Sequence, residues 1–341
     1  MVSAQLHLGV AIDGAGAHPA AWRVSAVEPA ALFTAGHYLK HAKLAEAASL
    51  DFVTLDDSLA LQPGGEDVVR GRLDALLTLS AIAPLTSRIG LVPTVTTTHT
   101  EPFHVSTSVA TLDYASRGRA GVLAVPSLTD AEAAHFGRRP APSPEDAAAE
   151  NAEVLDVIAR LWDSWEDDAI IRDAATGRFI DRDKLHYVDF QGRFFSVKGP
   201  SITPRPPQGH PVTFAYEGPA DVLLTGERVP GAKAVEPITV LLAPTDEAAA
   251  ERRRVLDDLH PWQPEGRFFA GTPARLAEEL QGGDVDGYLI RPAVLPDDLA
   301  LFTAEVVPAL QAAGAFRIGY AGTTLREHLG LGVAVNQYQG A

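Results

Sequence analysis

The sequence contains no cysteine, which excludes disulfide bonds, thiolate metal ligands and a cysteine nucleophile. It also has no uninterrupted apolar run near the roughly 18 residues that a membrane-spanning helix needs, and its start lacks the basic and apolar segments of a secretion signal. Hydrophobic residues make up 46% and charged residues 21% of the 341 positions. This balance is typical of a soluble globular protein, and we expect a cytoplasmic one.

Positive charge is in short supply, because 28 Lys and Arg residues stand against 44 Asp and Glu, for a formal net charge of −16. Such a chain repels the phosphate backbone of nucleic acids and anionic lipid surfaces. We therefore expect neither nucleic acid nor a membrane as a partner.

Several catalytic signatures are missing as well. There is no His-x-Glu-x-x-His helix motif, no Asp-x-Asp-x-Asp-Gly loop and no other metal-binding constellation, so we expect no metal site. The serine hydrolase pattern Gly-x-Ser-x-Gly is absent. Gly14-Ala15-Gly16 follows an apolar run but lacks the third glycine and the helix start of a dinucleotide-binding loop.

The sequence does contain short apolar runs that alternate with helical patterns. Apolar residues at helical spacing predict helices over 33–50, 71–83 and 102–114. The candidate strands are residues 6–12, 52–55, 89–95, 121–125, 212–216, 222–225, 238–243 and 287–290. Eight strands separated largely by helices predict an α/β fold, specifically a (β/α)8 TIM barrel formed by one domain over residues 1–341.

Two stretches depart from a regular barrel. Residues 126–209 form an insert after the fourth strand, with a predicted helix over 145–164 and a possible hairpin over 181–197; an insert of this length is expected to cover the barrel mouth. The fifth and sixth candidate strands are separated only by Glu217-Gly218-Pro219-Ala220, too few residues for an ordinary parallel crossover. We therefore expect the barrel to be altered around strands 5 and 6, either by a hairpin or by one run lying outside the wall.

The loop after the third strand, Thr96-Thr97-Thr98-His99-Thr100, is dense in hydroxyl groups. In a parallel barrel this end of the strand faces the ligand site, although Thr100 or Glu101 could simply cap the helix that begins at Pro102. His99 and His104 are candidate catalytic residues, because a histidine can move a proton near neutral pH; a packed or solvated histidine is the alternative for each.

Two further residues are candidates because of their places after strands. Asp57 follows the second strand and could bind a ligand or cap the next helix. Trp22 follows the first strand and could line a substrate pocket or pack the barrel mouth.

Several blocks of the sequence, in the same order along the chain, match a known family. They are residues 6–10, His18-Pro19-Ala20-Ala21-Trp22-Arg23, 51–61, 88–104, 110–121, Gly271-Thr272-Pro273, 291–296 and 322–331. These blocks resemble the luciferase-like flavin-dependent monooxygenases, in particular the branch of nitrilotriacetate and dibenzothiophene-sulfone monooxygenases. The resemblance implies a bacterial-luciferase type of barrel that takes reduced FMN from a separate NAD(P)H-dependent flavin reductase and uses oxygen to oxidise a small organic substrate. It also implies a homodimer or a larger homo-oligomer.

The resemblance places the flavin contacts at Asp57, Thr96 and Thr97. It also implies a phosphate site that this chain has altered. The family's histidine and Arg-Tyr pair before the insert helix align with Ala141 and with Pro144-Glu145, and a Gly-Ser-Ser turn that opens a helix after the fifth strand is replaced by residues 217–220. Losing a helix N-terminus and gaining a carboxylate both disfavour a phosphate.

The resemblance thus implies a two-component, FMN-dependent monooxygenase with a degenerate phosphate site. The alternatives are a flavin-free member of the family that acts as a non-catalytic subunit or small-molecule binder, and an enzyme that uses the same cavity differently.

Overall fold

The computed structural model describes residues 5–339 and shows a closed barrel of eight parallel strands. Neighbouring strands follow the order β1–β2–β3–β4–β9–β10–β11–β13, and β13 pairs with β1 to close the wall. These strands are β1 (His7–Ala11), β2 (Phe52–Leu55), β3 (Gly90–Thr96), β4 (Gly121–Val125), β9 (Val212–Ala215), β10 (Val222–Leu223), β11 (Lys233–Leu242) and β13 (Gly287–Pro292). All eight coincide with the runs that the sequence predicted, which confirms the barrel.

The expectation that the fifth and sixth runs could not be ordinary neighbours in the wall was wrong. β9 and β10 pair in parallel, with Phe214 opposite Val222, and both belong to the barrel. The short connection suffices because β10 has only two residues. After β9 the chain runs back along the wall only as far as Thr213 before β10 begins. There Asp221 accepts a hydrogen bond from the Thr213 N–H at 3.0 Å and donates its own N–H to the Thr213 hydroxyl at 3.0 Å. The connection from β10 to β11 also contains no helix.

A ninth strand, β12 (Arg267–Gly271), was not predicted from the sequence. It pairs in parallel with the second half of β11, from Ile238 to Leu242, beyond the point where β10 ends. β11 can hold both neighbours because it is ten residues long. The wall is therefore extended at the carboxyl ends of its strands.

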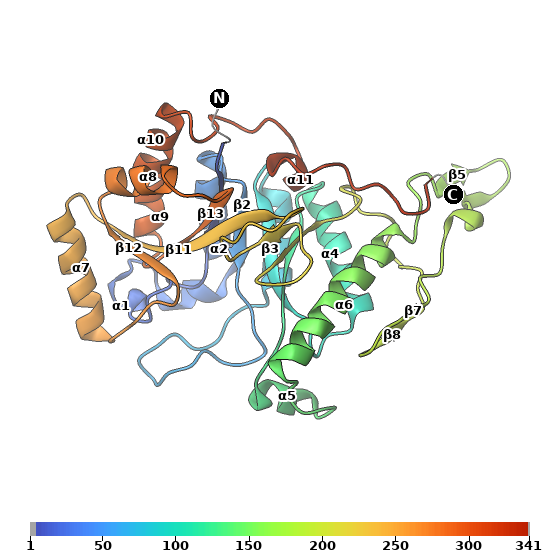
Figure 1. Ribbon diagram of the computed structural model, residues 1–341, viewed down its shortest axis with the longest axis horizontal. Coiled ribbons are helices and arrows are strands. Elements are labelled where there is room, and N and C mark those ends of the chain that lie inside the picture. Colours follow the sequence, from blue (N-terminus) through green and yellow to red (C-terminus); the bar gives the residue numbers. More distant parts are fainter. Residues whose placement is uncertain (1–4, 340–341) are drawn as a thin grey trace.

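Helices pack around the wall (Figure 1), but the connections from β9 to β10 and from β10 to β11 contain none. The predicted helices correspond to α2 (Ala35–Ala47), α3 (Ala75–Ile82) and α4 (Pro102–Ser116), and the side chains of Thr34 and Asp74 cap the first two. The others near the barrel are α1 (Ala21–Val24), α7 (Asp246–Leu259), α8 (Pro273–Gln281), α9 (Asp297–Leu301), α10 (Val307–Ala312) and α11 (Leu325–His328). Shorter helical turns are η1 (Pro29–Phe33), η2 (Ala83–Leu85), η3 (Arg182–Lys184) and the π-helical η4 (Phe302–Val306).

The interior of the barrel is filled by apolar side chains, among which Phe52 and Phe214 have ring centroids 4.9 Å apart. Leu325 of α11 and Leu329, which follows that helix, join this cluster at the amino ends of the strands. A methyl group on Gly90, the first residue of β3, would meet Leu325 at 2.5 Å. The amino end of the barrel is thus plugged, and the carboxyl end is left for a ligand.

The insert begins with α5 (Asp130–Phe136) and continues with α6 (Pro144–Asp163), which packs beside α4 on the outer face of β4. Its Trp162 is buried and donates a hydrogen bond to the carbonyl of Ser106 at 3.0 Å. Two hairpins follow, β5 (Ile170–Asp173) with β6 (Arg178–Ile180), and β7 (Phe190–Gln191) with β8 (Ser196–Val197). Figure 1 shows them beyond α6, at the opposite end of the molecule from α7.

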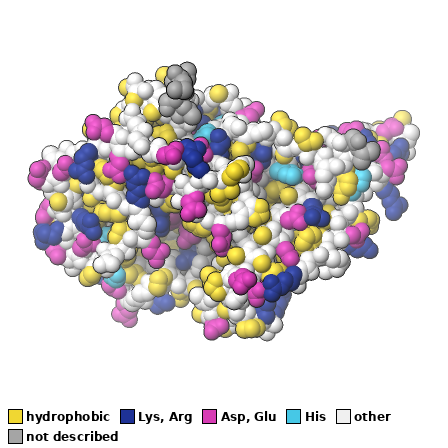
Figure 2. Space-filling model, in the orientation of Figure 1, with side chains coloured by type: hydrophobic (Ala, Val, Ile, Leu, Met, Phe, Trp, Pro, Cys, Tyr) yellow, Lys and Arg dark blue, Asp and Glu magenta, His cyan; other side chains and the backbone are white. Residues whose placement is uncertain are grey.

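The surface carries charges of both signs. On the face shown in Figure 2, the Lys and Arg side chains are interspersed with Asp and Glu. Within the described residues, no helix is both long enough and apolar enough to cross a bilayer.

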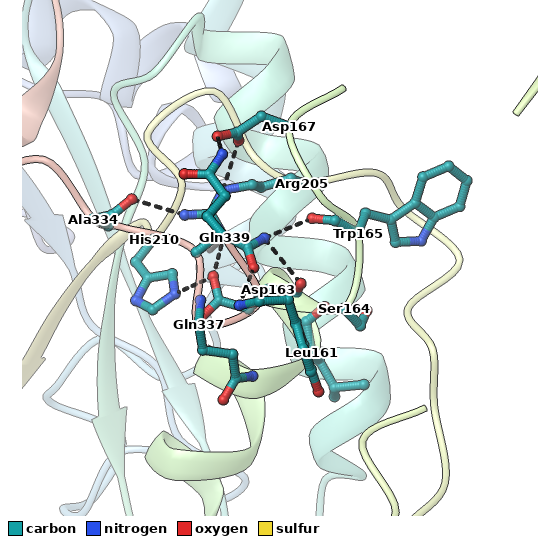
Figure 3. Close-up of polar contacts among 12 residues, drawn as sticks. Leu161, Asp163, Ser164, Trp165, Asp167, Arg205, His210, Ala334, Gln337 and Gln339 are labelled. Atoms are coloured by element: carbon teal, nitrogen blue, oxygen red, sulfur yellow. Dashed lines mark hydrogen bonds and ion pairs between the residues drawn. The ribbon is translucent and has the colours of Figure 1, made fainter. Parts of the chain in front are cut away.

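The C-terminal segment is held against the end of α6 by a polar network around Asp163 (Figure 3). The Asp163 carboxylate accepts hydrogen bonds from Arg205, from His210 at 2.8 Å and from the Gln337 N–H at 3.3 Å. Arg205 also donates to the carbonyl of Ala334 at 2.8 Å. The network therefore joins α6, the segment that leads into β9, and the chain after α11.

Candidate functional site

Two cavities lie at the carboxyl ends of the barrel strands. Their volumes are about 690 and about 570 Å³, within the usual range for small-molecule sites. They share six lining residues, namely Ala11, Asp13, Asp56, Thr239, Glu265 and Arg291. We therefore treat them as two lobes of one site and call them the larger and the smaller lobe.

Two carboxylic acids lie where the lobes meet. Asp13 follows β1 and Asp56 follows β2, and the N–H of Asp56 donates a hydrogen bond to the Asp13 carboxylate at 2.6 Å. Burial among protein atoms and, next, the nearby charge of Asp56 raise the pKa of Asp13 to about 7, although the hydrogen bond from the Asp56 N–H and the cations Arg291 and Arg72 act in the opposite direction. Burial also raises the pKa of Asp56, while Arg72 and Arg291 oppose the rise. Asp13 therefore holds a proton more readily near neutral pH than a free aspartate does, and Asp56, which is exposed at the cavity mouth, lies beside it.

The two cations of this site differ in their contacts. Arg72 lines the larger lobe and donates to the carbonyl of Ser58 at 3.1 Å. Arg291, on β13, lines both lobes, and its side chain makes no hydrogen bond or ion pair with another residue in the described part of the chain. Its guanidinium group is therefore available to a ligand.

The larger lobe is partly aromatic and includes Trp22, Phe33, Tyr38 and Trp262. The Trp22 indole N–H donates to the carbonyl of Asp67 at 3.1 Å, which fixes the ring in the wall. The structure therefore places Trp22 at the cavity that the sequence associated with it, while its contact with a substrate stays a prediction.

Asp57, the predicted flavin contact after β2, does not line either lobe. Its carboxylate accepts hydrogen bonds from the Ser58 N–H at 2.8 Å and from the Ala75 N–H at 2.9 Å, at the start of α3. This arrangement matches the capping alternative, and a flavin contact stays a prediction. The neighbouring Asp56 faces the cavity instead, and the sequence gave no signal that distinguished the two acids.

The hydroxyl loop after β3 is buried rather than open. Thr97 donates to the Asn151 side chain on α6 at 2.8 Å, and the Thr98 hydroxyl accepts from the Ser127 N–H at 2.8 Å. Thr96 is 7% exposed, and none of the three lines a lobe. Thr94, two residues before Thr96 on β3, does line the smaller lobe. Its buried hydroxyl has no hydrogen-bond partner among the described residues.

The two candidate histidines lie apart from the acids. His99 stacks on Phe136 of α5 with ring centroids 5.0 Å apart, and burial followed by the charge of Arg139 lowers its pKa, so that it is neutral at pH 7. His104 is exposed in the first turn of α4. Neither lines a lobe, and a catalytic role for either stays a prediction.

The structure also tests whether the phosphate of FMN has a receptor. After β9 the chain forms the loop 216–221 without a helix, and Glu217 in it is exposed. At the start of α6, Glu145 and Asp146 occupy the first turn, where they compete with an anion for the helix N-terminus. These two places do not fit a phosphate, whereas the lobes have room for a flat ring system. Among the described residues no group of His, Asp or Glu could hold a metal ion.

The barrel and the position of its site define a class of enzyme fold. Residues 15–314 match the family model of luciferase-like monooxygenases, and the chain belongs to this family.

Particular relatives can be named. The chain is 31% identical to an N-acetyl-S-(2-succino)cysteine monooxygenase of Bacillus subtilis, with 98% of each protein covered. It is 29% identical to nitrilotriacetate monooxygenase component A of Aminobacter aminovorans over 96% of each protein, and 30% identical to a dibenzothiophene-sulfone monooxygenase of Rhodococcus erythropolis over 90% and 92%. These relatives confirm the branch that the sequence blocks indicated.

The alignment with the Bacillus protein runs over 433 positions, many more than the 341 residues of this chain, so that relative contains segments that this chain lacks. Among solved structures, a riboflavin lyase with modified FMN and riboflavin has the same fold, with a TM-score of 0.85, 23% identity and 96% of each chain covered.

Proposed function

We propose that the chain is a flavin-dependent monooxygenase that takes reduced flavin from a separate reductase and oxidises a small organic substrate. Family membership and the names of its relatives support oxygenation as the reaction class. The observation that carries the proposal is the pair of connected lobes at the barrel mouth, which together have room for a ring system and a substrate.

Bound reduced flavin would supply the electrons for oxygen activation. In this chain Trp22 would contact the substrate in the larger lobe, and Asp57, Thr96 and Thr97 would shape the loops around the flavin. A homo-oligomer and a reductase partner belong to the same proposal.

We expect FMN and riboflavin to bind with affinities that agree within about threefold. The phosphate gains little because the loop after β9 has no helix and because Glu145 and Glu217 lie at the two places expected to receive it. Titrations of the purified protein with each flavin, oxidised and then anaerobically reduced, would be followed by fluorescence and absorbance.

The matched variant for this titration is Glu217→Arg, which should favour FMN over riboflavin by about tenfold if the phosphate lies near the loop, equivalent to about 1.4 kcal/mol. An FMN preference of tenfold or more in the unaltered protein would contradict the inference about the phosphate. Failure of both reduced flavins to bind would overturn the proposed function.

A second function is favoured by a specific observation, the charged groups Asp13, Asp56 and Arg291 at the centre of the mouth. They suit a polar small molecule as well as a flavin, and support a flavin-independent enzyme or binding protein. The flavin titration distinguishes the two functions, because the second predicts no binding of either flavin.

A further inference from the structure

Three adjacent strands bring one cation and two acids to the same point of the barrel mouth. β13, β1 and β2 are neighbours in the wall, and Arg291, Asp13 and Asp56 lie at or just beyond their carboxyl ends. All three residues line both lobes. The 2.6 Å hydrogen bond from the Asp56 N–H fixes the Asp13 carboxylate against the turn after β2.

The charges around the two acids are mixed. Arg291 and Arg72 face them from β13 and from the segment before α3, which lowers the cost of one negative charge. The remaining titratable groups that face the pair or line the same lobes are Tyr38, Tyr216, Glu236, Glu265, Arg267, His18 and His260. Glu236 and Arg267 form an ion pair at 2.5 Å with each other, so they add little net charge at the pair. At Asp13, burial and repulsion from Asp56 together outweigh the attraction of the two arginines, so this acid holds a proton more readily while Asp56 is ionised.

Two groups of the same mouth lack protein partners. The Thr94 hydroxyl is buried, 2% exposed by residue, and has no hydrogen-bond partner within the described residues. The Arg291 guanidinium group likewise makes none there. A buried polar group without a partner is costly and is normally satisfied by a ligand or water. The smaller lobe, which both residues line, is therefore built to receive polar atoms.

We propose that Asp13 and Asp56 share one proton and act as an acid–base pair on an oxygen atom of a small organic ligand that Arg291 and Thr94 hold in the smaller lobe. The protonated carboxyl group gives its proton to the ligand oxygen and becomes a carboxylate, and the reverse transfer restores it. A ligand with a carbonyl or hydroxyl oxygen meets these requirements. The inference rests on the proposed function, because it takes the barrel mouth as the place of reaction. The shared proton itself does not require bound flavin.

The first test follows the carboxyl groups in the ligand-free protein. The protein is labelled with ¹³C at the aspartate carboxyl carbons, and its NMR spectrum is recorded from pH 3 to pH 9 for the unaltered chain, Asp13→Asn and Asp56→Asn. The signal absent from Asp13→Asn is assigned to Asp13. Asp284→Asn is the matched control, because Asp284 is 94% exposed and remote from the mouth.

We expect Asp13 to titrate near pH 7 in the unaltered protein, and its midpoint to fall by roughly one pH unit in Asp56→Asn, where the like charge is gone. It should be unchanged in Asp284→Asn. Asp113, which burial raises to a pKa of about 6 at a separate site, provides an internal reference in every spectrum. A midpoint below pH 5, or one that Asp56→Asn leaves unchanged, would overturn the shared proton.

The second test measures the rate at which the protein-bound reduced flavin is oxidised by oxygen, as a function of pH. An inflection near pH 7 that disappears in both Asp13→Asn and Asp56→Asn supports proton transfer by the pair. A pH profile that is the same in both variants as in the unaltered protein would contradict the proton-transfer step. If flavin does not bind but Asp13 still titrates near pH 7, the proposed function fails while the shared proton stands.

Discussion

Replacing Asp163 with alanine is expected to lower the free energy of unfolding by about 3 kcal/mol, because it removes the buried acid that Arg205 and His210 share. Arg205 then keeps only its ion pair with the exposed Asp167 at 2.9 Å. Arg205 is 7% exposed, and its guanidinium group contacts the Asp163 carboxylate directly. Urea denaturation followed by circular dichroism measures the loss. The matched control on the same helix is Asp156→Ala, whose partner Arg160 is exposed, and it should change stability by less than about 1 kcal/mol. A loss for Asp163→Ala as small as the control would show that the network is not needed for stability.

The same substitution should remove part of the acid sensitivity of the protein. Burial alone would raise the pKa of Asp163, but the hydrogen bonds and positive charges of His210 and Arg205 outweigh it and hold the pKa below its usual value. A carboxyl group with a lowered pKa in the folded state stabilises the fold above its unfolded pKa, and this contribution is lost as the pH falls through the folded value. The stability difference between the unaltered protein and Asp163→Ala should therefore shrink below about pH 4.

Arg119→Met is expected to cost about 3 kcal/mol or more, since the arginine is a buried cation held by oxygen atoms rather than by an acid. Its side chain is 3% exposed and donates to the carbonyls of Ser116 at 2.7 Å, Ile89 at 2.6 Å, Ala83 at 2.9 Å and Thr86 at 3.1 Å, and to the Thr86 hydroxyl at 3.0 Å. Methionine fills much of the same volume but satisfies none of these groups.

The control for Arg119→Met is Arg117→Met, two residues earlier, where the side chain is exposed at the end of α4. This variant should stay within about 0.5 kcal/mol of the unaltered protein. Thermal and urea unfolding of both variants provide the comparison. Equal stability of the two would mean that water replaces the guanidinium group without cost.

The barrel could be predicted from the sequence because each wall strand is a short apolar run with turn residues or a helical pattern beside it. β12 was not predicted, because its apolar run, Phe268 to Ala270, is shorter than a typical strand. It pairs because β11 is long enough to accept a second neighbour. The rule that parallel neighbours need a long crossover failed at β9 and β10 for a related reason. It assumes that both strands run the full height of the wall, and β10 has two residues.

The site was predictable in position but not in its residues. The predicted carboxyl ends of the strands indicated that the site lies at the barrel mouth, and Trp22 lines the cavity there. The sequence could not show that Asp56 lines the cavity while Asp57 accepts a hydrogen bond from the first N–H of α3, because both follow the same strand and the choice depends on the backbone of the turn. Thr94 lies within an apolar run and Arg291 directly after one, and a single polar residue at such a place can point into the barrel or away from it.

The missing helices between β9, β10 and β11 also affect the order in which the chain folds. In this part of the wall Phe214 pairs with Val222, and Val222 pairs with Lys233, whereas the barrel closes only when His7 pairs with Gly287. Contacts between residues close in the sequence form sooner, because less chain entropy is lost in bringing them together. We therefore expect pulse-labelling hydrogen exchange to find the amides of β9 to β11 protected before those of β1. The part of the barrel with the shortest connections would then fold first, and the pairing of β1 with β13, which joins the two ends of the chain, would form last.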